Sequence, residues 1–232
     1  MINGRHHRIE DLSIRQHDGS LLIQRVLKLT DLNPLPVASM ILEIPPEEQN
    51  ATKLYTLRLP LNHSKVLIPY IQAMIAASFA FDALQMEKTE KIWNILEFVI
   101  ELEQEMYELA KKYFGLIEDE RQQVIIEDGF KYLQEIKRET KFDVIFIDAC
   151  YNQIIDDVIC PVEAFKSKEN LKIIKQALNR NGIVILSILA FEDDKVKMVL
   201  ACGEYRRNKA IFTKKLRETY RKFEFDTEPN VE

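Results

Sequence analysis

Apolar and polar residues alternate along much of the first 64 residues, which is the pattern of half-buried β-strands. Three segments show it most clearly: LLIQRVLKL, VASMILEI and KLYTLRLPL, at residues 21–29, 37–44 and 53–61. Asp18-Gly19 favours a tight turn between paired strands. We therefore predict a small antiparallel β-hairpin unit over residues 1–64.

From residue 70 onward, helical periodicity alternates with continuous apolar runs. Apolar residues at helical spacing predict helices over 70–86, around 106–113, from 130 onward, and from Pro161 to Asn181-Gly182. The apolar runs predict strands at 94–102, 123–128, 142–148 and 183–191. This order favours an open α/β sheet with right-handed crossovers, which we assign to a second domain, residues 65–232.

Three of the predicted strands end on a carboxylate, namely Glu101, Asp128 and Asp148. Ligands of open α/β sheets bind at the carboxyl ends of the strands. A carboxylate there can accept hydrogen bonds from ribose hydroxyls or from an adenine amino group. Acidic residues also end strands as loop starters and helix N-caps, so the pattern alone leaves both interpretations open.

The same segments resemble motifs of class I S-adenosylmethionine-dependent methyltransferases of the spermidine synthase-like branch. The likeness runs from about residue 65 to residue 191 and rests on QAMIAA, FVIELEQEMYELAKKYFGL, RQQVIIEDGFKYLQE, KFDVIFIDAC, DDVICPVEAF and LNRNGIVILSIL. It implies a Rossmann-like sheet with helices on both faces, preceded by the hairpin unit. It also implies S-adenosyl-L-methionine as the cofactor and a protein lysine or amino terminus as the methyl acceptor.

The resemblance further implies roles for five residues. Glu101 would hold the ribose hydroxyls, and Asp128 with Gly129 would hold the adenine. Gln72 would lie on the methionine side of the cofactor, and Asp148 would be the catalytic residue on the reaction face. Aminopropyl transfer is not expected, because the Asp-Ser-Ser-Asp-Pro signature of spermidine synthases is reduced to Asp-Ala-Cys-Tyr at residues 148–151.

The chain departs from this family at the cofactor loop. It has 6 glycines and no glycine-rich loop, and the segment between Met86 and Asn94 is too short for a strand, a loop and a helix. An alternative register takes KVLIP, residues 65–69, as the first strand and residues 70–72 as the loop. The family's final strand also has no counterpart. A catalytically inactive binding or regulatory protein, or an incomplete isoform, is therefore the alternative to an active enzyme.

Composition narrows the expected partners. The chain has 32 basic and 37 acidic residues, so its net charge of −5 argues against nucleic acid or an anionic membrane as a partner. We expect a protein substrate or binding partner, with a homodimer as an option. The N-terminus has no apolar signal region, and no apolar stretch is long enough to span a bilayer. These features indicate a cytosolic or nuclear protein, and we predict the cytoplasm.

Cysteine and histidine positions predict neither a disulfide nor a metal site. Cys150, Cys160 and Cys202 are odd in number and widely spaced, which is typical of a reducing compartment. We interpret Cys150 as a small packed hydrophobe rather than a nucleophile. The histidines have no ligands at metal-binding spacing, so no metal is expected.

Overall fold

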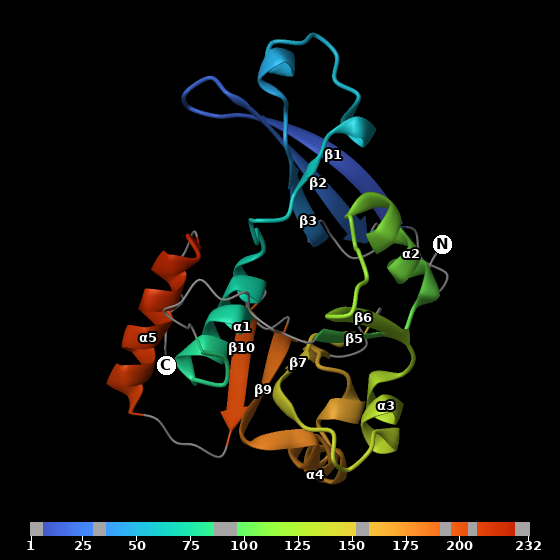
Figure 1. Ribbon diagram of the computed structural model, residues 1–232, viewed down its shortest axis with the longest axis vertical. Coiled ribbons are helices and arrows are strands. Elements are labelled where there is room, and N and C mark those ends of the chain that lie inside the picture. Colours follow the sequence, from blue (N-terminus) through green and yellow to red (C-terminus); the bar gives the residue numbers. More distant parts are fainter. Residues whose placement is uncertain are drawn as a thin grey trace. The chain divides into compact units, whose positions relative to one another are not determined.

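The computed structural model describes residues 7–29, 36–85, 97–151, 158–190, 196–203 and 208–225. The chain divides into two units, and each unit is built from separate stretches of sequence (Figure 1). Residues 1–68 and 94–127 form the first unit, and residues 69–93 and 128–232 form the second. The first unit therefore combines the N-terminal hairpins with part of the predicted α/β region.

The first unit contains the predicted antiparallel sheet. Its strands follow the order β1-β2-β3-β4 and are β1 (His7–Arg15), β2 (Leu21–Leu29), β3 (Pro36–Leu42) and β4 (Leu61–Asn62). At the β1–β2 turn, Asp18 accepts a 2.9 Å hydrogen bond from the Ser20 N–H and Gly19 has a φ of 86°. The strand predicted over residues 53–61 is wrong except at its last residue, since residues 53–60 form no strand and β4 begins at Leu61. There a short 3₁₀ helix forms (η2, Thr56–Arg58), and Pro60 cannot donate to a strand ladder.

A parallel strand pair and one helix complete the first unit. The pair is β5 (Glu97–Glu101) with β6 (Gln122–Ile126), joined through α2 (Gln104–Tyr113). After α2 the chain turns at Gly115, which has a φ of 65°. A Cβ at Gly115 would come within 2.7 Å of Leu61 Cδ1, so glycine is required here both by conformation and by space.

The second unit is a sheet with helices packed against both faces. Its strand order is β10-β9-β7, with β8 also paired to β9; the strands are β7 (Phe142–Ile147), β8 (Val158–Cys160), β9 (Leu178–Ala190) and β10 (Val196–Gly203). The helices are α1 (Pro69–Ala80), α3 (Gly129–Glu135), α4 (Lys168–Ala177) and α5 (Lys209–Lys222). This mixed α/β architecture confirms the predicted fold class.

Alternate residues of β9 pack on opposite helices. Ile183 and Ile185 pack against Met74 and Ala77 of α1, whereas Val184 and Leu186 lie in the core cluster that includes Ile174 of α4. The C-terminal helix α5 packs on α1 through Leu216 and Tyr220. Burial on both faces explains why residues 183–190 of β9 form a nearly continuous apolar run in the sequence.

Two expectations about the sheet are not met. The strands lie in separate sheets among the described residues, since β5 pairs with β6 and β7 pairs with β9. Residues 86–96, where the family's glycine loop would be expected, lie outside the described residues. The alternative first strand at 65–69 is wrong, because residues 65–68 form no strand and Pro69 begins α1. Proline suits that position, since the first helical N–H has no intrahelical acceptor.

The helix predicted from Pro161 to Asn181-Gly182 is also shifted. It begins instead at Lys168, where the Ser167 hydroxyl caps it by accepting a 3.2 Å hydrogen bond from the Asn170 N–H. It ends at Ala177, so Asn181 and Gly182 lie within β9. The serine cap provides the local start signal that Pro161 lacks.

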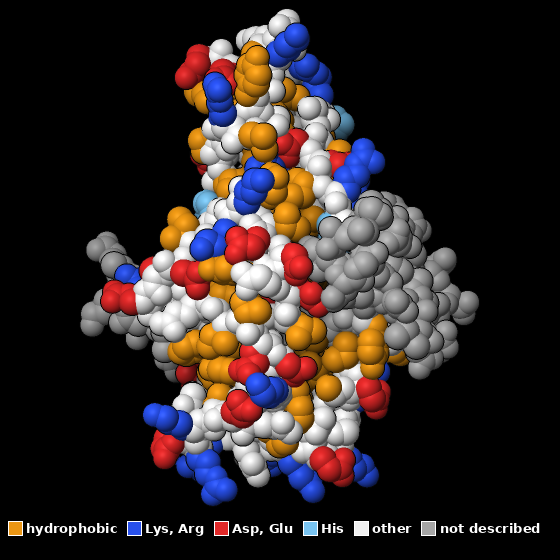
Figure 2. Space-filling model, turned by 90° about the vertical axis from the view of Figure 1, so that its right-hand side faces the viewer, with side chains coloured by type: hydrophobic (Ala, Val, Ile, Leu, Met, Phe, Trp, Pro, Cys, Tyr) orange, Lys and Arg blue, Asp and Glu red, His pale blue; other side chains and the backbone are white. Residues whose placement is uncertain are grey.

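Large hydrophobic side chains are exposed in the first unit, where Tyr55, Leu57 and Ile117 are 72%, 76% and 71% accessible. On the face drawn in Figure 2, hydrophobic side chains are interspersed with acidic and basic ones. Among the helices of the described residues, none has the length and apolar character needed to cross a membrane.

Candidate functional site

Asp148 lies exposed directly after β7 and is held by a tyrosine. Tyr70, in the first turn of α1, donates its hydroxyl to Asp148 Oδ2 over 2.7 Å. Burial is the main reason that the pKa of Tyr70 is raised above its usual range, and the negative charge of Asp148 and the hydrogen bond to it raise this pKa further. Tyr70 is therefore a permanent donor at neutral pH that orients the carboxylate. Sequence reasoning missed Tyr70, and its only signal was its place two residues before Gln72.

A disulfide adjoins this carboxylate. Cys150 and Cys160 are bonded, with their Cα atoms 4.4 Å apart, so the prediction of unpaired cysteines is wrong. The chain folds back here, because the Tyr151 N–H donates to Ile159 O over 3.0 Å and the Val162 N–H donates to Ala149 O over 2.9 Å. The two cysteines are 10 residues apart in the sequence, and this spacing alone does not indicate that they lie close together in the fold. Cys202 is free and exposed.

Gln72 lies on a buried face of α1, and only 1% of its surface is accessible. A buried amide must find hydrogen-bond partners within the fold. Its position in the interior of α1 places it on the same helix as Tyr70, the residue that contacts Asp148.

Asp128 and Gly129 form the start of α3. Asp128 is the N-cap, and its Oδ1 accepts from the N–H groups of Phe130 at 2.8 Å and Lys131 at 3.0 Å. Gly129 is the first helical residue. Since both bonds end on Oδ1, the second oxygen, Oδ2, remains available as an acceptor. Capping and ligand binding are thus compatible on this side chain.

Glu101 ends β5 and belongs to the first unit, whereas the other four candidate residues belong to the second. Its Oε1 accepts a 2.9 Å hydrogen bond from the Glu103 N–H. Its backbone carbonyl accepts from the Glu127 N–H, which extends the pairing of β5 with β6. The bond to Glu103 fixes one carboxylate oxygen and leaves Oε2 as an acceptor.

Glu101 and Asp128 each keep one acceptor oxygen of a kind that an adenosine group could use. Glu101 Oε2 and Asp128 Oδ2 are acceptors, and ribose hydroxyls and the adenine amino group are donors. The described residues contain no group of three or more histidine, cysteine or acidic side chains arranged for a metal ion.

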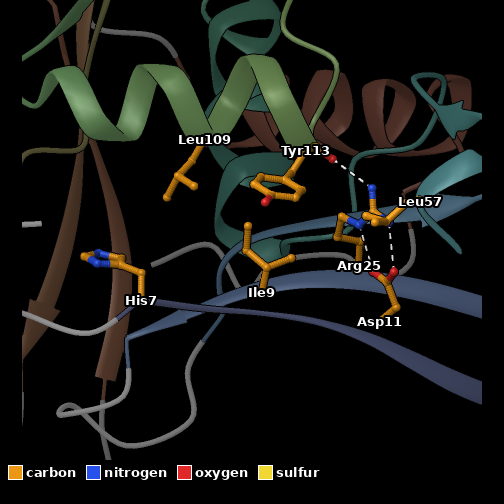
Figure 3. A pocket seen from close by; sticks show the side chains of 7 residues that line it. All are labelled: His7, Ile9, Asp11, Arg25, Leu57, Leu109 and Tyr113. Atoms are coloured by element: carbon orange, nitrogen blue, oxygen red, sulfur yellow. Dashed lines mark hydrogen bonds and ion pairs between the residues drawn. The ribbon is translucent and has the colours of Figure 1, made fainter. Parts of the chain in front are cut away.

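A separate cavity of about 360 Å³ lies within the first unit. Figure 3 shows His7 at one end and the Arg25–Asp11 pair at the other, with Ile9, Leu109 and Tyr113 between them. Arg25 is only 4% accessible. It donates to both Asp11 carboxylate oxygens over 2.8 Å and to the carbonyls of Tyr113 and Thr56 over 3.2 Å. None of the predicted site residues lines this cavity.

Comparison with known proteins gives partial alignments to two kinds of enzyme. The spermine synthase of Saccharomyces cerevisiae is 35% identical over 96 residues, which are 38% of this chain and 30% of that enzyme. The eEF1A lysine and N-terminal methyltransferase of Xenopus laevis is 29% identical over 98 residues, 41% of this chain and 14% of that enzyme. The matched part thus spans less than a third of the length of either relative.

Solved structures support the fold. Human methyltransferase-like protein 13 in complex with SAH matches with a TM-score of 0.53 and 18% identity, covering 70% of this chain and 96% of that one. A probable spermidine synthase from Corynebacterium glutamicum matches with a TM-score of 0.61 and 11% identity, covering 100% and 96%. Residues 88–215, more than half of the chain, match the spermine/spermidine synthase domain. The chain therefore belongs to the spermine/spermidine synthase domain family, with a class I methyltransferase fold.

Proposed function

We propose that this protein is an S-adenosylmethionine-dependent methyltransferase that modifies a lysine or amino terminus of a protein. The observation that carries the proposal is the end of β7, where, among the described residues, Asp148 is the one oriented carboxylate and is followed by a disulfide-bonded cysteine at 150. A single carboxylate can orient one amine, whereas gripping a diamine would call for further acidic groups. The eEF1A lysine and N-terminal methyltransferases among the relatives support the same acceptor class.

In this proposal the residues mainly position the reactants. Bound S-adenosylmethionine would supply a methyl group on a sulfonium. Glu101 Oε2 and Asp128 Oδ2 would accept from the ribose and the adenine, and Gln72 would line the methionine side. Asp148 would accept a hydrogen bond from an N–H of the acceptor amine and direct the nitrogen lone pair at the methyl carbon. The amine must be deprotonated, and most of the rate would come from proximity.

Isothermal titration with S-adenosylmethionine tests the cofactor part of the proposal. We expect micromolar binding that Glu101→Ala abolishes and Glu105→Ala, an exposed neighbour in α2, leaves unchanged. No heat up to millimolar ligand would refute the enzyme and favour the alternative, a catalytically inactive binding or regulatory protein.

Methyl transfer is tested separately with radiolabelled S-adenosylmethionine and purified eEF1A as the probe protein. We expect Asp148→Asn to lower incorporation while leaving cofactor binding intact, because Asp148 faces the acceptor. Equal loss of both would contradict this division of roles. The cytoplasmic location, the homodimer and the domain boundary between residues 64 and 65 stay predictions from the sequence.

A further inference from the structure

The disulfide beside Asp148 joins two sulfurs in different environments. Cys150 is exposed, whereas Cys160 is 0% accessible. An attacking thiolate therefore has access to Cys150 rather than to Cys160. Thiol–disulfide exchange depends on such access, and exposed disulfides are the readily exchanged ones.

The fold holds both cysteines in place by contacts other than the disulfide. The Tyr151–Ile159 and Val162–Ala149 backbone hydrogen bonds flank the pair, and the Glu163 N–H donates to the Tyr151 hydroxyl over 2.9 Å. A reduced Cys160 is also compatible with its site, because a buried thiol packs as a small hydrophobe. The two thiols would thus stay close enough to bond again.

The oxidation state of Cys150 changes what Asp148 can bind. Cys150 Sγ lies 3.9 Å from Asp148 Oδ1, on the oxygen that Tyr70 does not contact. A disulfide sulfur has no proton to donate, whereas a thiol has one. Reduction therefore adds a donor at Oδ1, and oxidation removes it.

We infer that Cys150 and Cys160, here called the exchange pair, form a reversible exchange site for small thiols such as glutathione, and that its oxidation state sets the hydrogen bonding of Asp148. In reduction, a thiolate attacks Cys150 Sγ, the S–S bond breaks, and Cys160 leaves as a thiolate that takes a proton. A second thiol attacks the mixed disulfide at the small-thiol sulfur. It releases the Cys150 thiol and forms the oxidised dimer of the small thiol, so two electrons and two protons enter the protein.

The consequence for methyl transfer rests on the proposed function. In the disulfide form, Oδ1 is an acceptor without a thiol beside it and is open to the amine of a substrate. In the dithiol form, the Cys150 S–H competes with the amine for that oxygen. The disulfide form is then the one with the better acceptor site.

The first experiment measures the exchange itself. The chain carrying Cys202→Ser is equilibrated in buffers of reduced and oxidised glutathione, alkylated and weighed by mass spectrometry. We expect the exchange pair to pass from disulfide to dithiol as the buffer becomes reducing. In Cys160→Ala, we expect a stable mixed disulfide of Cys150 with glutathione, because the resolving thiol is gone. The same alkylation of the exchange pair in every buffer would overturn the inference. This outcome is measured on the chain that keeps both cysteines, so it does not depend on whether Cys160→Ala folds.

The second experiment observes Asp148 directly. In protein labelled with ¹³C-aspartate, the Asp148 carboxyl resonance, assigned with Asp148→Asn, should move on reduction, whereas the Asp143 resonance on β7 should not. An unmoved Asp148 resonance would overturn the inference. If the pair exchanges and the resonance moves but no methylation occurs in either state, the exchange site stands and the proposed function fails.

Discussion

The buried ion pair between Arg25 and Asp11 offers a quantitative test of what holds the first unit together. Arg25 joins four elements, since it lies on β2 and binds Asp11 of β1 and the carbonyls of Thr56 in η2 and Tyr113 in α2. The substitution Asp11→Asn keeps the side-chain shape but removes the charge. The amide oxygen of the asparagine can still accept a hydrogen bond from Arg25 Nε. Its amide nitrogen, however, would face Arg25 Nη2, and because both groups are donors no hydrogen bond can form there.

The expected loss of stability follows from these contacts. Removing one partner of a buried ion pair costs about 3–5 kcal/mol. The Asp11 side chain keeps 15% accessibility against 5% for Arg25, so we expect the lower end, about 3 kcal/mol. The measurement is urea unfolding followed by circular dichroism at neutral pH. Glu10→Gln is the matched control, because Glu10 lies next to Asp11 on β1 and pairs with the more exposed Lys28.

The pH dependence supplies a second arm. The hydrogen bonds from Arg25, ahead of its charge, hold the pKa of Asp11 below its usual value. A lowered folded pKa means that the carboxylate stabilises the fold fully above about pH 4, the usual aspartate range, and that this contribution is lost as the pH falls through the folded pKa. The deficit of Asp11→Asn should therefore shrink below that range. A deficit no larger than that of Glu10→Gln, or one that does not shrink in acid, would refute the reasoning.

Three further predictions rest on single contacts. Gly19→Ala should cost about 1 kcal/mol for its positive φ alone, and Gly115→Ala should cost clearly more in urea unfolding, because its Cβ would also meet His63 Cε1 at 2.8 Å; equal losses would contradict the packing argument. Ser167→Ala should destabilise the second unit by about 1 kcal/mol through loss of the α4 cap, whereas Ser167→Asn should restore most of it. Asp148→Asn should lower the pKa of Tyr70, visible as earlier ionisation in an ultraviolet pH titration, because the negative charge that raises it is gone; an unchanged titration curve would show that burial alone is responsible.

Local patterns in the sequence predicted most of the helices and strands, but they did not predict which distant segments pair with one another. Continuous apolar runs located β7 and β9, and in β9 the physical reason is burial on both faces, which leaves few polar positions. The start of α4 was misplaced, because Pro161 is permissive for a helix whereas the Ser167 hydroxyl actually caps it. The division of the strands into separate sheets depends on pairing across the chain, about which the periodicity of a single segment says nothing.

The site shows the same limit. Asp148 could be singled out as a candidate because a carboxylate after an apolar strand is a local signal. Its contact with Tyr70 joins residues 78 positions apart, and the approach of Cys150 to Cys160 depends on the return of β8 to β9. Arg25 and Asp11 each look like an ordinary polar position in an alternating strand. Only the register of β1 with β2, which pairs these two residues directly, brings them together.

The interleaving of the two units has a consequence for synthesis on the ribosome. The chain passes between the units three times, near residues 68, 93 and 127. The first unit therefore cannot complete its fold until residue 127 has left the ribosome. The apolar helix α1 waits longer still, because Ile183 and Ile185, which cover its Met74, are made about a hundred residues later. During that interval a hydrophobic helix lacks its partner strand, so we expect this protein to depend on chaperones while it is being made more than one whose units are each continuous in sequence.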